Sequence, residues 1–411
     1  MDLPLLIPVR QHFPGHRIDD TPAAMREALE GLGLRSAVRP GMRVAITAGS
    51  RGIANLPVLL ATAVAYLREL GAEPVVVAAM GSHGGGTAEG QRAVLQSLGI
   101  TPGAVGAPVA CGVAVVDLGT TADGLTVYFD AYAAGCDGVL AINRVKPHTS
   151  FHGPLESGLV KMLVVGLGKP AGAAQFHSLG AARLTGALAS IGQVILAKVP
   201  VLGGVAVLEN GREETAELVP VRPAELLTRE PELLERARSY LPRLPVKALD
   251  LLVVDEMGKN FSGTGMDTNV IGRMGIYGVP DGDPFIERIA VLDLSEASHG
   301  NANGMGLADF ITRRFQAKID FAATYKNTLT ATFVQRARMP IVLESDRTVL
   351  ETALATLGSP APDRVRVVRI RNTLLLEQFW CSPAVAAELA GRVEVVGAPE
   401  PWHFDVDGNL A

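Results

Sequence analysis

Apolar residues in the first half of the chain form short runs that alternate with longer amphipathic segments. The runs at 43–47, 73–79 and 137–143 have the length and valine-rich composition of buried strands. The segments 56–70 and 87–98 have helical length and end near glycines. Strands separated by helices favour a doubly wound, mostly parallel α/β sheet of Rossmann-like type.

The second half begins after a further helix near 181–193 and a charged stretch at 215–245, rich in proline, that we interpret as an exposed helical connection. Beyond it, apolar runs typical of strands return, with two helical segments between them. The strand-like runs are 248–255, 288–294 and 364–370, and the helical segments lie near 306–314 and 348–357.

These patterns predict two domains. The first, 1–246, is an N-terminal α/β domain, and the second, 247–389, is a mixed α/β domain that closes over the cleft. The tail, 390–411, is expected to pack back on the first domain. We expect the site in the cleft between the two domains.

Composition narrows the class of protein. With 48% hydrophobic and 19% charged residues, the 411-residue chain has the make-up of a folded α/β protein. Its formal charge of -5 argues against a nucleic-acid partner. The three cysteines form no CxxC pair, and the chain has neither a basic N-terminal signal region nor an apolar run long enough for a membrane span. We therefore expect a cytoplasmic protein without a membrane or nucleic-acid partner.

Candidate chemistry gathers after the predicted strands. Arg51, His83 and His148 each follow such a strand by a few residues, and ligands of doubly wound sheets bind beyond the carboxyl ends of strands. We therefore expect all three to rim one crevice. The glycines at 84–86 suit close approach to phosphate or carboxylate, although a histidine in such a turn can also serve only the local backbone.

Lys161 lies in the apolar stretch 155–166, where a buried ammonium would tend to lose its proton and become nucleophilic. The alternative is a lysine whose head reaches solvent from a helix face. His177, sixteen residues further on, is either a helix-end histidine or a ligand for nickel, copper or zinc. No HExxH, CxxC or HxH pattern accompanies it, so a metal there would take most of its ligands from a cofactor.

The run from Gly81 to His177 resembles the nickel-pincer lactate racemase family of 2-hydroxy-acid racemases and epimerases. The spacing of sixteen between Lys161 and His177 matches the family, and the spacing of His83 and His148 is close to it. The resemblance implies a nickel-pincer nucleotide, a pyridinium mononucleotide with two thio-acyl groups, joined to Lys161 by a thioamide. It implies His177 as the nickel ligand and His83 and His148 as the acid/base pair.

By the same resemblance, Ser157 and Gly158 lie beside the cofactor, and maturation enzymes that build it are partners of the chain. The reaction implied is hydride removal from the hydroxyl-bearing carbon while a histidine removes the hydroxyl proton. The planar 2-keto acid then rotates and takes the hydride on its other face. Arg51 is our candidate for the substrate carboxylate, with Lys259 or Arg273 contacting substrate from the second domain.

The match to the family is incomplete. The family's Gly-Gly-Arg-Lys run before the lysine, its Asp-x-Thr-Arg-Pro-Thr pattern around the arginine and its tyrosine–serine–lysine pattern are absent or only partly kept. We therefore expect a substrate other than lactate. Two alternatives stay open: a relative that binds a nucleotide or anion without turnover, and a nicotinamide-dependent 2-hydroxy-acid dehydrogenase. Against the second, no GxGxxG follows the first predicted strand.

Overall fold

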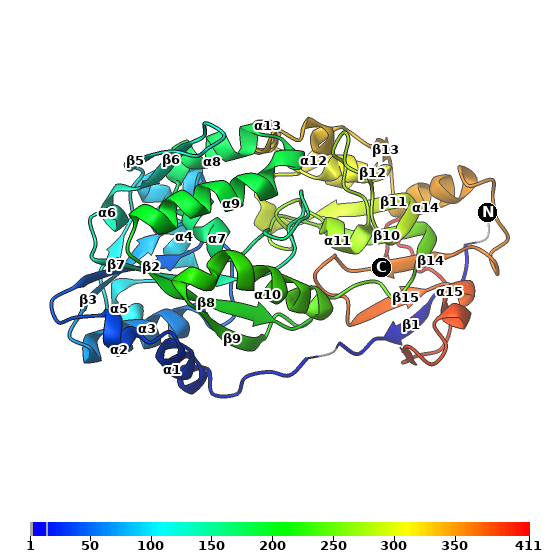
Figure 1. Cartoon of the computed structure of the whole chain (residues 1–411). Coiled ribbons are helices and arrows are strands. Elements are labelled where there is room, and N and C mark those ends of the chain that lie inside the picture. The colour runs from blue at the N-terminus through cyan, green and yellow to red at the C-terminus, as the bar shows by residue number, and fades with distance from the viewer. Residues whose placement is uncertain (1–2, 14) are drawn as a thin grey trace. The chain divides into compact units, whose positions relative to one another are not determined.

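The computed structural model describes residues 3–13 and 15–411 and divides the chain into two compact units (Figure 1). One unit is Pro14–Leu241, and the other combines Met1–Phe13 with Pro242–Ala411. The sequence predicts a boundary near residue 246, a few residues from this division. It also assigns the first thirteen residues to the N-terminal domain, whereas they belong to the C-terminal unit.

The sheet of the unit Pro14–Leu241 confirms the predicted doubly wound architecture. Its strand order is β4-β3-β2-β7-β8-β9, and each neighbouring pair is parallel except β8 with β9. The strands are β2 (Arg43–Ala48), β3 (Glu73–Ala78), β4 (Val109–Ala110), β7 (Gly138–Arg144), β8 (Val201–Glu209) and β9 (Thr215–Val221).

Alternating side chains of these strands enter two separate cores, one on each face of the sheet. Val44 and Ile46 join the core beneath α1 (Thr21–Gly31) and α3 (Leu56–Glu69), and Ala45 joins the opposite core. Figure 1 shows α9 and α10 across that opposite face. Because the central strands β2, β3 and β7 are buried on both sides, each reads as a nearly continuous apolar run. The remaining longer helices are α4 (Ala88–Ser97), α8 (Lys169–Ser178), α9 (Ala181–Lys198) and α10 (Leu226–Tyr240).

The segment 215–245 differs from the exposed helical connection predicted from its charge and prolines. It begins with β9, an edge strand antiparallel to β8, and continues into α10, whose apolar side is buried. Pro220 is tolerated in β9 because β9 has no neighbour on its other edge. A further two-stranded sheet, β5 (Val115–Thr120) with β6 (Thr126–Asp130), was not predicted.

The other unit contains an eight-stranded sheet in the order β13-β12-β11-β10-β14-β15-β1-β16. Its pairs are parallel from β13 to β14 and antiparallel from β14 to β16, which agrees with the predicted mixed α/β domain. The strands are β10 (Ala248–Met257), β11 (Phe285–Leu294), β12 (Phe310–Thr312), β13 (Ile341–Leu343), β14 (Val367–Ile370), β15 (Gln378–Cys381), β1 (Ile7–Arg10) and β16 (Glu394–Val395).

Two predictions for this half are corrected. The helix expected over 306–314 is instead β12 followed by α12 (Arg313–Ala317), because Phe310 and Ile311 fill a central strand position beside β11. The tail, expected to pack on the first domain, contacts its own unit. There β16 pairs with β1, and the indole Nε1 of Trp402 donates to the carbonyl of Pro4 at 2.9 Å. The helix expected over 348–357 is α14 (Asp346–Ala355).

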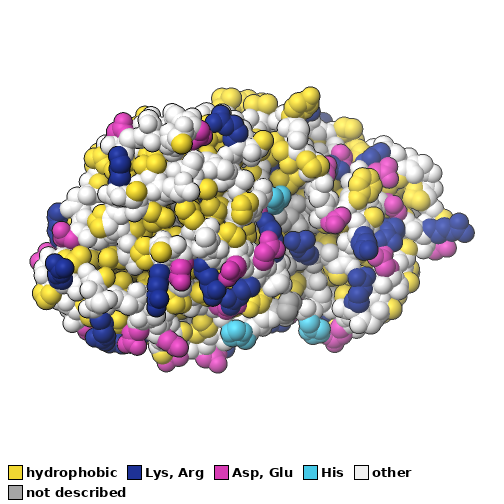
Figure 2. Space-filling view, viewed as in Figure 1, with side chains coloured by type: hydrophobic (Ala, Val, Ile, Leu, Met, Phe, Trp, Pro, Cys, Tyr) yellow, Lys and Arg dark blue, Asp and Glu magenta, His cyan; other side chains and the backbone are white. Residues whose placement is uncertain are grey.

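The surface charges and the apolar character of the helices can be compared with the partners expected from the sequence. No helix among the described residues has the length and apolar character needed to cross a bilayer. Figure 2 shows cationic and acidic side chains interspersed on the face in view, without one extended patch of a single sign. Cys111, Cys136 and Cys381 are all free thiols.

Candidate active site

The strand order places three of the predicted loops side by side. Strands β3, β2 and β7 are neighbours in one parallel sheet, so the segments that carry His83, Arg51 and His148 leave the same edge. The loops after β2 and β3 touch, because the Ser50 hydroxyl is hydrogen-bonded to Nδ1 of His83. No pattern in the sequence singles out Ser50, apart from its position directly before Arg51.

Glycine determines the course of the His83 loop. Gly81 has φ +58° and donates its amide to the carbonyl of Gly166 at 3.1 Å, which ties the loop to the segment after Lys161. Gly84, Gly85 and Gly86 all have left-handed φ values, +66°, +69° and +70°. A Cβ at Gly84 would lie 2.5 Å from a backbone carbon of Gly90. His83 itself is exposed at the end of this loop.

His148 is held by its own loop. Its backbone N–H donates to Glu156 at 2.5 Å, and its Nδ1 accepts the backbone N–H of Ser150 at 3.0 Å. The imidazole lies against the ring of Phe151, with centroids 4.3 Å apart and planes 31° apart. Main chain and ring are therefore both oriented before any ligand binds.

Glu156 is the centre of this loop, and its side chain is fully buried. It accepts hydrogen bonds from the backbone N–H of Gly153 at 3.0 Å and from Arg238 Nη2 at 2.5 Å, and pairs with His152 at 3.3 Å. Burial disfavours the charged form of the Glu156 carboxylate. The hydrogen bonds from His152, His148 and Gly153 outweigh this effect and lower its pKa. Glu156 is therefore an anionic anchor for the His148 loop.

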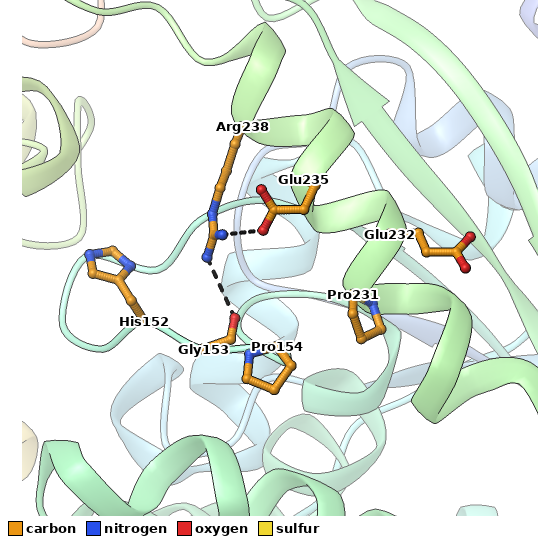
Figure 3. A pocket seen from close by; sticks show the side chains of 7 residues that line it. All are labelled: His152, Gly153, Pro154, Pro231, Glu232, Glu235 and Arg238. Atoms are coloured by element: carbon orange, nitrogen blue, oxygen red, sulfur yellow. Dashed lines mark hydrogen bonds and ion pairs between the residues drawn. The ribbon is translucent and has the colours of Figure 1, made fainter.

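Figure 3 shows the outer side of this anchor as a depression beside α10. Arg238 there bonds to Glu235 and to the carbonyl of Gly153. The other lining residues are His152, Pro154, Pro231 and Glu232. Arg238 is held by these partners and by Glu156, so the residues that line the depression support the His148 loop from its outer side.

Lys161 ends the short helix α7 (Leu159–Lys161), and the five residues after it, Met162–Gly166, form a π-helix. Such segments are rare and often mark functional sites, because they redirect the side chains around them. Burial lowers the pKa of the half-buried Lys161 to about 7, helped by the positive charges of Arg51 and Lys146. At neutral pH, Lys161 is therefore unprotonated in a large fraction of the molecules.

The backbone before Lys161 rests on a buried acid. Glu230 of α10 accepts the N–H of Val160 at 2.9 Å, and burial raises the pKa of its carboxyl to about 7. A Cβ on Gly158 would lie 2.4 Å from Glu230 Oε1, so only glycine fits there without movement. The carbonyl of Gly158 accepts from the Asn143 side chain at 2.8 Å. Ser157 pairs through its backbone with Lys146 (2.9 Å).

His177 lies in the last turn of α8, and its surroundings keep it neutral. Burial, together with the positive charge of Lys161, lowers its pKa to about 4. An unprotonated imidazole is the form that binds nickel, copper or zinc. Aromatic rings connect the two residues: Lys161 Nζ lies 5.7 Å from the centroid of Phe151, whose ring is 6.2 Å from that of Phe176, and the Phe176 ring is 5.6 Å from that of His177.

The start of α8 is fixed by a buried ion pair that the sequence analysis missed. Lys169 is fully buried, has a left-handed φ of +56°, and its Nζ lies 2.6 Å from Asp130 Oδ2. The same ammonium donates to the carbonyl of Ala78, the last residue of β3. Lys169 therefore connects the helix of His177 with β6 and with the strand that leads to His83.

The other charged residues expected at the site differ in their surroundings. Arg51 is exposed, and its loop is held by Glu209, which accepts the N–H of Ala54 at 2.7 Å. In the other unit, Lys259 donates to the side-chain oxygen of Asn327 at 2.7 Å. Arg273 donates to Asp309 and to the carbonyl of Leu307, both at 2.9 Å.

Lys161 and His177 fit the two bonds that the expected cofactor would form with the chain. A thioamide link needs an unprotonated amine, and a nickel ligand needs a neutral imidazole; with a pKa of about 7 Lys161 supplies the first in part at pH 7, and with a pKa of about 4 His177 supplies the second. Within residues 3–13 and 15–411 there is no group of three or more His, Cys, Asp or Glu side chains arranged to hold a metal.

Comparisons with known proteins show which fold the chain has. No protein-family model matches the chain, and no curated protein matches its sequence. The structure of the lactate racemase apoprotein from Thermoanaerobacterium thermosaccharolyticum is similar, with a TM-score of 0.50 and 12% identity over 83% of this chain and 87% of that one. The chain shares the fold of this lactate racemase. A crystal structure from Thermotoga maritima, a structural-genomics target, matches at TM-score 0.48 and 16% identity, over 67% of this chain and 72% of that one.

Proposed function

We propose that the chain is a racemase or epimerase of a 2-hydroxy acid that works with a nickel-pincer nucleotide bound to Lys161. The observation that carries the proposal is the pair formed by Lys161 and His177. Burial lowers the pKa of the first to about 7 and of the second to about 4, so one is a reactive amine and the other a neutral metal ligand. The fold shared with a lactate racemase supports the same conclusion.

Lys161 would hold the cofactor through a thioamide, beside Ser157 and Gly158, and His177 would supply the ligand of the chain to nickel. When bound, the group accepts a hydride from the hydroxyl-bearing carbon of the substrate. A 2-hydroxy acid cannot lose that hydride easily while its oxygen keeps its proton. The protein therefore has to remove the hydroxyl proton at the same time.

The residues of the chain perform that task. His83 and His148 lie at one sheet edge, on loops at either side of the Arg51 loop, and each supplies an imidazole for proton transfer. Arg51, exposed on the loop between them, offers a planar guanidinium to the substrate carboxylate, and Lys259 is a second cationic candidate. The crowding of positive charge around Lys161 by Arg51 and Lys146 also favours an anionic substrate.

The test is a racemisation assay in D₂O with the chain produced together with the maturation enzymes. A single enantiomer of each of several 2-hydroxy acids is supplied, and formation of the other enantiomer is measured by chiral chromatography. Hydride transfer returns the original hydrogen, so the product carries no deuterium on the hydroxyl-bearing carbon. The matched control is Lys161→Arg, which keeps the charge and cannot form the thioamide. Deuterium on that carbon, or full activity in Lys161→Arg, contradicts the proposal.

A second candidate is a protein that binds an anion or nucleotide without turnover. The three consecutive left-handed glycines at 84–86 favour it, since such backbones present amides to anions. This alternative predicts unchanged ligand affinity in His83→Ala and His148→Ala and no racemisation by the loaded chain. Isothermal titration with 2-hydroxy acids separates the two functions.

A further inference from the structure

The short helix that carries Lys161 receives its N-terminal cap from another helix. The first amides of a helix have no partner within it, and Gly158, the residue before α7, has no side chain that could accept them. Glu230 of α10 takes this role, because its Oε2 accepts the N–H of Val160 at 2.9 Å. The glycine also makes room for the carboxyl, since a Cβ at Gly158 would overlap with it. Glu230 therefore fixes the backbone directly before Lys161.

The loop of His148 is held by the same helix through one intermediate side chain. Glu156 is fully buried and accepts the N–H of His148 at 2.5 Å and that of Gly153 at 3.0 Å. A buried carboxylate is costly without a cation beside it, and Nη2 of Arg238 lies 2.5 Å from its Oε1. Figure 3 shows Arg238 reaching from α10 to the carbonyl of Gly153. Arg238 therefore holds the main chain of His148 through Glu156.

The part of α10 between these two side chains is packed into the core. Glu230 and Arg238 are eight residues apart, which is roughly 12 Å along a helix. Apolar residues between them are buried in the same core as the backbone of α7; they are Leu233, Leu234 and Ala237. Beyond Arg238, the hydroxyl of Tyr240 donates to Glu217 of β9 at 2.6 Å. A shift of α10 would therefore disturb core packing as well as both polar contacts.

From this arrangement we infer that α10 sets the positions of Lys161 and His148 relative to each other, and that Glu230 and Arg238 are positioning residues of the candidate site. The inference rests on the proposed function for the roles of Lys161 and His148. Glu230 acts only through the backbone before Lys161, and Arg238 only through Glu156. Such support matters for catalysis, because a displacement of about 1 Å can cost about 10²-fold in rate.

The first experiment measures the amine of Lys161 in the chain without cofactor, as the pH midpoint of its modification by a limiting amine-selective reagent. Glu230→Met removes the acceptor of the Val160 amide, so that α7 can shift and the amine becomes more exposed. The midpoint should rise by at least about one unit from about 7, because burial is the main cause of its low value. Glu230→Gln keeps an acceptor oxygen and should keep the midpoint near 7.

These two variants separate positioning from charge and from stability. Both lose the negative charge of Glu230, and only Glu230→Met loses the hydrogen bond to Val160. The matched control is Arg229→Met, whose guanidinium pairs with exposed Glu232 and which should leave the midpoint unchanged. If Glu230→Met does not fold, Glu230→Asp replaces it, because its carboxyl is withdrawn from Val160 by one methylene and should shift the midpoint in the same direction. A midpoint near 7 in the folded variant overturns the inference.

The second experiment follows the loop of His148 by hydrogen exchange. Arg238→Met leaves the carboxylate of Glu156 without its guanidinium, so the amides of His148 and Gly153 should exchange at least about tenfold faster. The amides of β2 should keep their wild-type rates, which distinguishes loosening of the loop from a loss of global stability. Arg238→Lys keeps a cation and should recover part of the loss. If the loop amides of Arg238→Met exchange as in the wild type, or if those of β2 accelerate equally, the inference is wrong.

The third experiment uses the chain loaded with cofactor. Glu230→Met and Arg238→Met should each lower kcat at least about tenfold and change KM less than about twofold, because neither side chain contacts substrate. An unchanged kcat, or a change confined to KM, contradicts a positioning role. A loaded wild-type chain that racemises no 2-hydroxy acid refutes the proposed function. The midpoint of Lys161 and the exchange of His148 then still decide whether α10 holds both segments.

Discussion

At the scale of single residues, the site depends on side chains whose protonation is set by burial. Lys161 and His177 are both moved away from their charged forms, by desolvation first and by neighbouring positive charge second. The sequence indicated this for Lys161, because a lysine in an apolar run is costly to keep as a cation. It could not indicate it for His177, since the charge that acts on it comes from Lys161 through the fold.

Lys161 should be the most reactive amine of the chain at neutral pH. Its pKa of about 7 makes it about half unprotonated there, whereas an unperturbed lysine with a pKa of about 10.4 is almost entirely protonated. Modification by a limiting amine-selective reagent, mapped by peptide mass spectrometry across pH 5–10, should show a midpoint near 7 at Lys161. The Lys161→Arg variant should lose this fast phase. A midpoint near 10 at Lys161 would contradict the assignment.

The same shift predicts how stability depends on pH. Between about pH 7 and the unfolded-state pKa of about 10.4, the unfolded chain keeps the proton of Lys161 and the folded chain has lost it. The free energy of unfolding therefore receives a contribution from Lys161 that rises with pH across this interval, and its burial is most costly below pH 7. Urea unfolding should show that Lys161→Met gains most relative to wild type below pH 7 and less toward pH 10. A gain independent of pH would mean that the amine is not perturbed.

At the scale of elements, the strands and most of the longer helices could be predicted because each carries its own pattern. Strands β2, β3, β7 and β10 are buried on both faces and read as apolar runs. The errors fall where a short strand is hidden in a mixed segment. The charges and prolines of 215–245 are typical of an exposed connection although the segment contains β9, and β12 lies inside a stretch whose pattern favours a helix.

The supports of the site could not be predicted, since they join elements distant in sequence. Glu156, Glu230 and the pair Lys169–Asp130 are isolated charged residues beside apolar runs, and only the fold shows what they hold. The available signal was the presence of a charge where burial is expected. Lys169 shares this signal with Lys161, because both are lysines in largely apolar sequence.

The ion pair Lys169–Asp130 should matter more for positioning α8 than for stability. Removing one partner alone, as in Lys169→Met or Asp130→Leu, leaves a buried charge and should cost about 3–5 kcal/mol. The double variant replaces the pair by apolar side chains and should recover most of that stability. We expect thermal unfolding to show this recovery while the histidine NMR signal of His177 stays displaced from its wild-type position. If the stability and the His177 signal both returned to their wild-type values, the ion pair would contribute to stability alone.

Gly158 should tolerate no side chain. A Cβ there would lie 2.4 Å from Glu230 Oε1, so Gly158→Ala must displace the buried carboxyl and should destabilise the chain by about 1–3 kcal/mol. The matched control is Gly186→Ala in α9, where an added Cβ meets nothing within 4 Å and helix propensity predicts a gain of up to about 1 kcal/mol. Chemical denaturation measures both. Equal effects at the two positions would contradict the packing around Glu230.

At the scale of the whole molecule, the two-unit α/β architecture was predicted, and the assignment of the chain ends was not. The boundary depended on a change in composition near residue 246, which lies close to the observed division. Strand β1 enters the sheet of the C-terminal unit by pairing with β15, more than 360 residues away, and with β16. Such pairing leaves no local signal, because a four-residue strand fits many partners.

We propose that Lys161 is the covalent anchor of a nickel-containing nucleotide. The most direct measurement is the intact mass and nickel content of the chain purified after production with the cofactor maturation enzymes. We expect a mass increment that maps to Lys161, about one nickel per chain, and neither in Lys161→Arg. An unmodified, metal-free chain, under conditions that load a lactate racemase, would contradict the account and favour the anion-binding alternative.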